Sequence, residues 1–501
     1  MRPLIREVTS LHTPESLVER VRGEPGIVLL RSALVDSQHA RYSFVTARPF
    51  LTFRSGGSRC ELNAADRRHI QFGNPWHALD ALMSRYELLD EVDLPFPFGG
   101  CFGYWGYDLK NFVEAKLPRR ALNDMELPDC HVGFYDSLVV FDHRLGKTWI
   151  VSTGLGVDGS RSENRADQQL AFWQHALESK PAEGAHRASP ILHHASRVTS
   201  NFSPAAFIAA VEHAQRYIRA GDIYQVNLAQ RLSASCSLSG WEIFERLAEV
   251  SPAPFSAYLD CGDFQIASSS PEMFLRLSGP HIQTRPIKGT RPRSADPTRD
   301  AQLTYELQTS PKEMAELVMI TDLLRNDLGK VCEYGSVQVP ELVRLERYPQ
   351  VQHLVSTVEG RLRPDATHFA AFASCFPGGS ITGAPKIRAM EIIDELEPVT
   401  RGPYTGALGY LGFNRESQLS ILIRTAISKE RMACFHVGAG IVADSVPSAE
   451  YEETLAKAGG FLAALELGSS ERSSTGDTAR VRESAAEDGI QDNARQRRSR
   501  Q

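Results

Sequence analysis

The 501-residue sequence lacks paired cysteine motifs, long apolar runs and a strong excess of either charge. Its 8 cysteines are scattered and none forms C-x-x-C, which argues against a zinc or redox site of that type. No apolar run approaches the roughly 18 residues of a membrane span, and the first residues lack the apolar core of a signal peptide. These absences predict a cytoplasmic protein with reduced thiols that does not associate with a membrane.

Several common functional signatures are also missing. Gly378 and Gly383 have the spacing of a P-loop, but Ala384 stands where the phosphate-binding lysine is needed. Neither G-x-S-x-G nor a Ser-His-Asp order supports a hydrolase triad. A net charge of −6 argues against a nucleic-acid partner, while it leaves room for a local basic pocket that binds an anionic small molecule.

The composition is that of a globular protein, with 42% hydrophobic and 23% charged residues. We divide the chain into an N-terminal region 1–178, a linker 179–203, a motif-rich region 204–467 and a polar tail 468–501 that is predicted to be disordered. Helix and strand signals alternate without a strict βαβ rhythm. The pattern predicts an α+β fold with large antiparallel sheets.

The stretch "TRPIKGTRPR" places Lys288 next to Gly289, a residue that permits close approach of a ligand. Three arginines surround this lysine, namely Arg285, Arg291 and Arg293. A lysine in such a setting either binds an anion or is pushed toward its neutral, nucleophilic form. Glu272, in "SSSPEMF", lies between two strand-like runs that can bring it near Lys288.

Residues 310–327 are predicted to form a helix with Ser310 as its N-cap and Glu313 completing a capping box. Glu316 then lies at the edge of the apolar side of this helix. A carboxylate there can bind a hard cation, although a glutamate at such a boundary more often reaches water.

Residues 448–467 are predicted to form the last helix, with Glu450, Glu453 and Lys457 on one face. One interpretation is a surface Glu–Lys pair worth about 0.3–0.5 kcal/mol. The other is a second metal carboxylate with a basic group beside it, since Mg²⁺ typically takes one or two carboxylates from a protein.

Two further segments carry candidate binding groups. Gly438 and Gly440 in "HVGAGIVADS" either expose backbone N–H groups to a ligand or mark a strand bulge. Arg424 is the one charged residue in the strand-like run "LSILIRTAI". A guanidinium in such a run either pairs with an acid or grips a planar carboxylate.

Together these segments resemble the chorismate-utilising enzymes, strongly over residues 200–467 and more weakly before them. The matching motifs include "GDIYQVNLAQR", "SSSPEMF", "PIKGTRPR", "KEMAELVMITDLLRNDLG", "FPGGSITGAPKIRAMEIIDELEP", "ILIRTA", "GAGIVADS" and "AEYEETLAKA". The resemblance implies two large antiparallel sheets packed on each other and wrapped by helices, the anthranilate synthase component I-like chorismate-binding fold.

Two positions separate the branches of this family. Isochorismate and salicylate synthases carry a water-activating lysine where this sequence has Gln225, which argues for ammonia as the nucleophile. Anthranilate synthases typically read P-I-A-G-T, whereas "PIKGT" resembles aminodeoxychorismate synthase component I. That resemblance implies conversion of chorismate and ammonia to 4-amino-4-deoxychorismate, in p-aminobenzoate and folate biosynthesis. The alternatives are anthranilate synthase component I and, in another class, a non-catalytic chorismate-binding regulatory subunit.

The resemblance also implies roles for individual residues. Lys288 resembles the nucleophile that adds to C2 of chorismate, and Glu272 resembles the acid–base that protonates the departing C4 hydroxyl. Glu316 and Glu453 resemble the ligands of an Mg²⁺ ion that holds the ring carboxylate. The expected substrate contacts are Gly289, Thr290, His353, Tyr404, Arg424, Gly438, Ala439, Gly440 and Lys457.

Two further partners follow from the resemblance. None of the cysteines lies in the elbow of a glutaminase, so a separate glutamine amidotransferase subunit is expected to supply ammonia. Some members also hold a tryptophan at a second site, and its occupancy here is a hypothesis. The matching residues are Ser32, Arg41, Tyr42, Pro254, Phe255 and Ser256.

Overall fold

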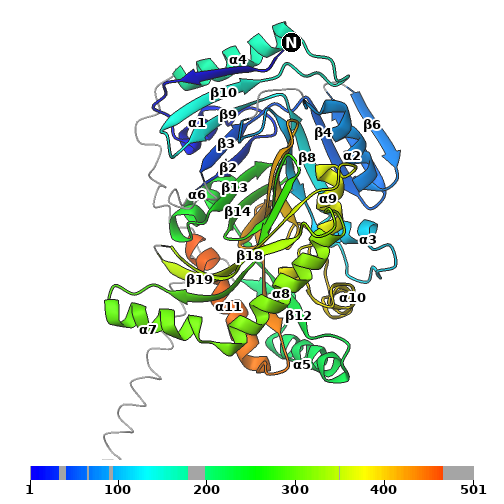
Figure 1. The fold of residues 1–501 in the computed structure, drawn as a ribbon, viewed down its shortest axis with the longest axis vertical. Coiled ribbons are helices and arrows are strands. Elements are labelled where there is room, and N and C mark those ends of the chain that lie inside the picture. Colours follow the sequence, from blue (N-terminus) through cyan, green and yellow to red (C-terminus); the bar gives the residue numbers. More distant parts are fainter. Residues whose placement is uncertain are drawn as a thin grey trace, which may run out of the picture.

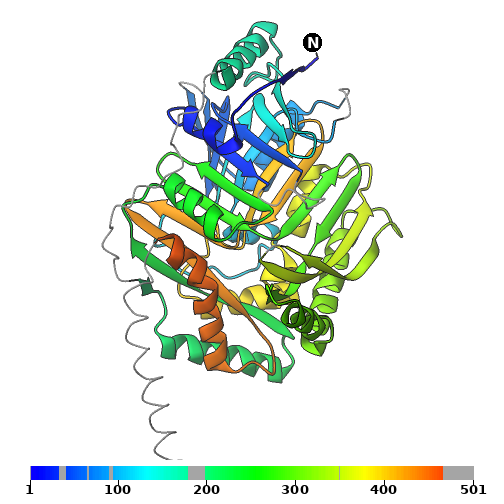
Figure 2. The ribbon, with the colours of Figure 1, turned by 90° about the vertical axis from the view of Figure 1, so that its left-hand side faces the viewer.

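The computed structural model describes residues 2–32, 41–64, 67–89, 94–178, 198–348 and 350–465. Within them, two 12-stranded sheets pack against each other, and helices cover their outer faces (Figures 1 and 2). All pairings between the named strands are antiparallel, so the predicted α+β fold with two large antiparallel sheets is confirmed. Most of the predicted linker, 179–197, and the predicted tail, 468–501, lie outside the described residues.

The first sheet joins strands from both ends of the chain. Its order is β1 (Leu4–Val8), β10 (Lys147–Ser152), β9 (Ser137–Asp142), β3 (Tyr42–Thr46), β2 (Val28–Arg31), β13 (Phe255–Asp260), β14 (Gln265–Ser270), β23 (Thr425–Lys429), β24 (Met432–Ile441), β12 (Gln225–Ser235) and β11 (Thr199–Ser200), with β20 (Gly383–Ala384) pairing β12.

The second sheet is built in the same way. Its order is β17 (Ile287–Pro292), β19 (Val351–Arg361), β16 (His281–Arg285), β15 (Met273–Ser278), β22 (Glu416–Ile421), β21 (Ala407–Gly412), β7 (Gly100–Trp105), β8 (Cys130–Tyr135), β4 (Leu51–Gly56), β5 (Arg59–Ala64) and β6 (Arg67–Phe72), with β18 (Gln338–Arg347) pairing β19. The regions before and after the linker therefore share both sheets.

Helices pack on both sheets and on one another. On the first sheet, α4 (Glu163–Glu178) contacts β10, α6 (Gly240–Val250) contacts β14 and α11 (Pro447–Ala464) contacts β24. On the second sheet, α8 (Pro311–Gly329) contacts β17 and β19 (Figure 1). The remaining helical segments are α1 (Pro14–Arg20), α2 (Pro75–Tyr86), η1 (Tyr107–Leu109), α3 (Lys110–Val113), α5 (Pro204–Ala220), α7 (Pro297–Gln308), α9 (His368–Cys375), η2 (Gly379–Ile381) and α10 (Lys386–Leu396). No helix within the described ranges is long and apolar enough to cross a membrane.

Aromatic side chains fill the space between the sheets. Phe44 from the first sheet packs edge-on against Tyr410 from the second, with ring centroids 5.2 Å apart, and Tyr410 stacks on Phe102 at 5.4 Å. Each such side chain contributes about 1.5–3 kcal/mol through removal of apolar surface from water. This core fixes the two sheets relative to each other and so fixes the residues that project from them.

The predicted helix at 310–327 begins as expected but differs in one detail. The Ser310 hydroxyl accepts a hydrogen bond from the backbone N–H of Glu313, as an N-cap should. The prediction that Glu313 completes a capping box is wrong, because its carboxylate instead accepts a bond from Arg291, 3.4 Å away. The nearby guanidinium offers a charge-assisted partner that outcompetes the neutral backbone N–H.

The run "LSILIRTAI" is not one continuous strand, and that prediction is wrong. Strand β22 ends at Ile421 and β23 begins at Thr425, so the chain passes from one sheet to the other between them. Arg424 lies in this passage with a φ of 50°, a left-handed conformation that side chains other than glycine rarely adopt. Strain of this kind persists where surrounding structure enforces it, and it is common at binding sites.

Candidate active site

A cavity of about 470 Å³ lies where the two sheets, α8 and α11 meet. It brings together residues separated by more than two hundred positions in the chain. The predicted residues that line it are Glu272, Lys288, Gly289, Thr290, Glu316, His353, Tyr404, Arg424, Gly438, Gly440, Glu453 and Lys457. Two other predicted residues, Gln225 and Ala439, are not part of its lining.

Glu272 lies between β14 and β15 with only 7% of its surface exposed. Burial raises the pKa of its carboxyl group, and this effect outweighs hydrogen bonds from Ser380 and the backbone of Ile287 and the charge of Lys288. A carboxyl group with a raised pKa holds its proton to higher pH than usual, which suits a general acid.

Lys288 lies on β17 and faces the same cavity as Glu272. The three arginines near it in sequence are each paired with an acid. Arg285 bonds to Glu346 at 2.5 Å, Arg291 to Glu313 at 3.4 Å and Arg293 to Asp300 at 2.9 Å. Each of the three guanidinium groups therefore has an acidic partner of its own, and Arg291 also lines the cavity that Lys288 faces.

Gly289 shapes the strand that carries Lys288. It has a φ of +65°, and a Cβ atom there would lie 2.7 Å from Leu307 Cδ1. A β-bulge falls between Lys288 and Thr290, so both residues reach the cavity. The Thr290 hydroxyl lies 2.8 Å from Nδ1 of His353, and burial lowers the pKa of His353 to about 4, which keeps this imidazole neutral at physiological pH.

Glu316 on α8 and Glu453 on α11 line the cavity from two separate helices. Burial raises the pKa of Glu316, Lys288 opposes that rise, and the carboxylate of Glu453 adds to it. Two carboxylates that repel each other fit a hard cation, which would remove the repulsion. No group of three or more His, Cys, Asp or Glu within the described ranges forms a complete metal site, so Mg²⁺ there would take further ligands from water and substrate.

Lys457 lies one helical turn beyond Glu453 and binds its carboxylate at 2.7 Å. The same ammonium donates to the carbonyl oxygen of Gly438 at 2.8 Å. The predicted Glu–Lys pair on this helix face is confirmed, and since both residues also line the cavity, the role of Glu453 as a metal ligand stays a prediction. The third residue of that face, Glu450, is buried and accepts a hydrogen bond from Ser445 at 2.6 Å.

Arg424 is a cation in the cavity wall for which the described residues provide no acidic partner. Burial lowers the pKa of its guanidinium group. Arginine nevertheless stays charged in proteins, and a buried, unpaired cation is costly. An anionic ligand in the cavity would remove that cost, which favours the interpretation that Arg424 grips a carboxylate.

Tyr404 and the glycine-containing strand β24 form another part of the cavity wall. Gly438 allows close packing there, because a Cβ atom on it would lie 2.8 Å from Asn227 Oδ1 and 2.9 Å from the Tyr404 hydroxyl. Tyr404 stacks on His436 with ring centroids 4.9 Å apart. Gln225 lies behind this wall, with its side-chain nitrogen 2.5 Å from where a Cβ on Gly440 would stand.

Among the other residues that line the cavity, three with uncharged polar side chains were missed by the sequence interpretation. They are Ser380, which bonds to Glu272, and the pair Asn227 and His436. Asn227 lies two residues after Gln225 on β12, and period-2 alternation along that strand places both on one face. No local pattern marked Ser380, because its bond to Glu272 joins segments about a hundred residues apart.

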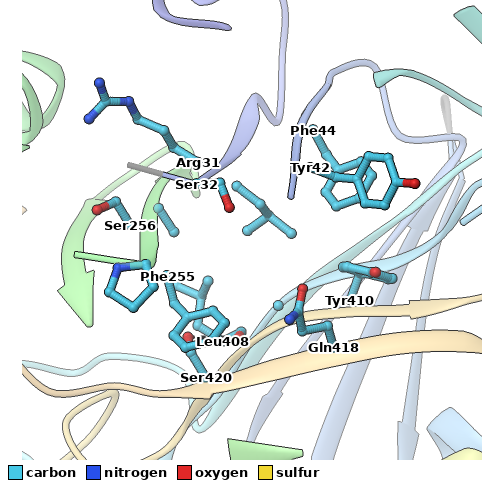
Figure 3. A pocket seen from close by; sticks show the side chains of 14 residues that line it. Arg31, Ser32, Tyr42, Phe44, Phe255, Ser256, Leu408, Tyr410, Gln418 and Ser420 are labelled. Carbon is cyan, nitrogen blue, oxygen red and sulfur yellow. Dashed lines mark hydrogen bonds between the residues drawn. The ribbon is translucent and has the colours of Figure 1, made fainter. Parts of the chain in front are cut away.

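A second cavity, of about 40 Å³, lies between the two sheets away from the first (Figure 3). Strands β2, β3 and β13 supply one side, and β21 and β22 supply the other. Of the residues predicted for a tryptophan site, Ser32, Tyr42, Pro254, Phe255 and Ser256 line it. Arg41 does not line it, because its guanidinium is held by Asp142 at 2.5 Å.

The larger cavity is equipped for an anionic substrate. Its lining includes the basic side chains of Lys288, Arg424 and Lys457, the buried carboxyl group of Glu272, and the carboxylates of Glu316 and Glu453, which would offer oxygen ligands to a metal. Such a combination can bind a small dicarboxylate and activate a leaving group on it.

Comparison with known proteins agrees with this chemistry. The family model for chorismate binding enzymes matches residues 30–463. Anthranilate synthase component 1 of Acetivibrio thermocellus is 40% identical over 472 residues, covering 93% of this chain and 95% of that protein. Aminodeoxychorismate synthase component 1 of Escherichia coli (strain K12) is 38% identical over 455 residues, covering 90% and 96%.

A solved structure shows the same fold. Anthranilate synthase component I from Streptococcus pneumoniae TIGR4 superposes with a TM-score of 0.73 at 30% identity, covering 85% of this chain and 93% of that chain. The architecture is thus the anthranilate synthase component I-like fold, and the residues that line the cavity lie between Asn227 and Phe461. The chain belongs to the family of chorismate binding enzymes.

Proposed function

We propose that this chain is aminodeoxychorismate synthase component I, which converts chorismate and ammonia to 4-amino-4-deoxychorismate. The observation that carries the proposal is the presence of Lys288 in the same cavity as the buried acid Glu272. Overall identity does not separate this function from anthranilate synthase, because both kinds of relative are about equally similar. The proposal therefore depends on the residues of the site.

In the first step, Nζ of neutral Lys288 forms a bond to C2 of chorismate. Both ring double bonds shift, the C4–O bond breaks, and the hydroxyl leaves as water with the proton that Glu272 donates. The raised pKa of Glu272 keeps that proton available, and the closeness of Lys288 to this carboxyl group supports its role as the covalent nucleophile.

In the second step, ammonia forms a bond to C4, both double bonds shift back, and the C2–N bond to Lys288 breaks. The new amine gives a proton to the Glu272 carboxylate, which restores the acid for the next cycle. The enolpyruvyl group is retained. A separate glutamine amidotransferase subunit supplies the ammonia, and the cytoplasm remains the expected location.

The other cavity residues hold the substrate during both steps. Glu316 and Glu453 would hold Mg²⁺, which supplies a positive charge for the ring carboxylate. Arg424, Tyr404 and the backbone at Gly438 would bind the pyruvyl carboxylate, a role supported by their position in the cavity lining. His353, neutral and fixed by Thr290, offers a hydrogen-bonding group to the ring.

Product analysis tests the proposal. Purified protein with chorismate, Mg²⁺ and ammonium should give 4-amino-4-deoxychorismate, which yields p-aminobenzoate only after a separate lyase is added. Fluorescent anthranilate with released pyruvate would instead establish the alternative, anthranilate synthase component I.

Mass spectrometry tests the covalent step directly. Protein mixed with chorismate in the absence of ammonia should carry an adduct that maps to Lys288, and the Lys288→Ala variant should carry none. If wild-type protein binds chorismate but never turns it over at any ammonium concentration, it is a non-catalytic binding subunit.

We also propose that the smaller cavity in Figure 3 is a tryptophan site, since five of the six residues expected for it line that cavity. Release of tryptophan from denatured protein would support this assignment. An extract without tryptophan, together with no effect of added tryptophan on the melting temperature, would remove it.

A further inference from the structure

Arg401 lies just behind the cavity, after the end of α10, and is 2% exposed. Its guanidinium donates to Glu397 through Nε at 2.9 Å and through Nη2 at 2.7 Å. It also donates to the carbonyl oxygens of Ile381 at 3.1 Å and Asn227 at 2.8 Å, and to the Thr405 hydroxyl at 3.2 Å. One side chain therefore ties together four separate segments.

Three of these segments form the cavity wall. Asn227 and Ile381 line the cavity themselves, and Thr405 follows Tyr404, which also lines it. The Arg401 guanidinium additionally lies 5.7 Å from the centre of the Tyr404 ring. Ile381 follows Ser380, whose side chain bonds to the acid Glu272. A displacement of Arg401 would therefore move both Tyr404, an expected substrate contact, and Ser380, the hydrogen-bond partner of Glu272.

Glu397 fixes the orientation of Arg401 through its two hydrogen bonds with the guanidinium group. Its Oε1 also accepts a hydrogen bond from the backbone N–H of Ala229 at 2.9 Å, which connects this pair to β12. Burial opposes the charge on Arg401, but the Glu397 carboxylate outweighs this effect and raises the pKa of the guanidinium. A buried ion pair is weak evidence for a stabilising role, since apolar substitutes are often as stable. What apolar substitutes lack is the rigid fork that holds several acceptors at once.

We propose that Arg401, oriented by Glu397, is a positioning residue that aligns Asn227, Ile381 and Tyr404 around bound chorismate. The inference rests on the proposed use of this cavity for chorismate and holds for either amine product.

A double-mutant cycle with Arg401→Lys and Tyr404→Phe tests the proposal. Lysine keeps the positive charge but cannot make the several hydrogen bonds of the planar guanidinium group. The segments around the cavity should therefore be held less rigidly, while a buried cation remains. Chorismate consumption with ammonium gives kcat and KM for each variant, and the melting temperature reports stability. Lys110→Met is the matched control, because Lys110 is 1% exposed and its ion pairs, with Asp108 at 3.6 Å and Asp394 at 3.8 Å, lie outside the cavity lining.

We expect Arg401→Lys to lower kcat/KM by roughly tenfold or more at temperatures where the variant is fully folded. Tyr404→Phe should also cost roughly tenfold alone, but less than about twofold in the Arg401→Lys background, because the hydroxyl is already misplaced. In the Lys110→Met background, Tyr404→Phe should keep its full effect.

Additive effects of Arg401→Lys and Tyr404→Phe would overturn the inference, and so would equal coupling with Lys110→Met. In both cases, an active wild type would leave the proposed function intact. A wild-type protein that neither binds nor consumes chorismate would overturn the proposed function and this inference together.

Discussion

Lys457 and Glu453 form an ion pair one turn apart on α11, with 2.7 Å between Nζ and Oε1. The pair matters because Glu453 is an expected metal ligand and Lys457 also holds the carbonyl oxygen of Gly438. Without a metal, the lysine occupies part of the carboxylate that the metal would use. The metal site and the wall at Gly438 are thereby linked through one ammonium group.

Replacement of Lys457 by methionine should strengthen Mg²⁺ binding in the absence of chorismate by about two- to fivefold, since an exposed ion pair worth about 0.2–1 kcal/mol no longer has to break. The KM for chorismate should rise in the same variant, because a cation that faces the dianion is lost. Titration calorimetry with Mg²⁺ measures the first effect and steady-state kinetics measures the second. Lys457→Arg keeps the charge and is the control; weaker Mg²⁺ binding by Lys457→Met would contradict the link.

Glu272→Gln should lower kcat by roughly 10²–10⁴, the usual contribution of a positioned acid–base group. Burial raises the pKa of Glu272, so the wild-type carboxyl group stays protonated to higher pH and then loses activity as the pH rises through that value. The alkaline side of the kcat/KM profile should therefore flatten in Glu272→Gln. A profile with the same alkaline limb in both proteins would assign that limb to another group.

The parts of this structure that the sequence predicted depend on local patterns. Strand-like runs mark β14 and β15 on either side of Glu272, and the cap at Ser310 marks the start of α8. Apolar spacing on α11 places Glu453 and Lys457 on one face. Each of these features depends on a short, continuous stretch of the chain, which is why a single sequence reveals it.

The parts that escaped prediction depend on partners far away in sequence. Arg285 is neutralised by Glu346, 61 positions later, and no local pattern announces that pair. The ties that Arg401 makes to Asn227 span 174 positions. The strand is interrupted at Arg424 because the chain passes there from β22 in one sheet to β23 in the other. The apolar residues on both sides give no sign of this interruption.

Arg424→Gln should weaken chorismate binding by roughly tenfold to a hundredfold, because a charge-assisted hydrogen bond is worth about 1.5–3 kcal/mol. The melting temperature should stay equal or rise, since the described residues offer this buried cation no acid and its removal relieves a desolvation cost. Arg293→Gln is the matched control, since Arg293 is paired with Asp300 and lies near Lys288 in sequence. Equal losses of affinity in both variants would mean that Arg424 acts only through overall charge.

Acidification should destabilise the fold between about pH 6.5 and pH 4, because buried histidines stay neutral there while the unfolded chain takes up protons. Burial lowers the pKa of His353 and of His368 to about 4, so the stability these groups contribute is present above pH 6.5 and is lost as the pH falls toward 4. Each contributes about 3 kcal/mol at most, at 1.36 kcal/mol per pKa unit. The raised pKa of Glu272 acts with the opposite sign and cannot cause this loss.

His368 is the better probe because it lies outside the cavity and bonds to Ser417 at 3.0 Å and to the carbonyl oxygen of Gly279 at 2.7 Å. In His368→Gln the melting temperature should fall less between pH 7 and pH 5 than in wild type, even if the variant is less stable at pH 7. His281→Gln is the control, because it removes a histidine that is exposed rather than buried. Parallel melting curves for wild type and His368→Gln across this range would show that uptake of protons by other groups governs the acid transition.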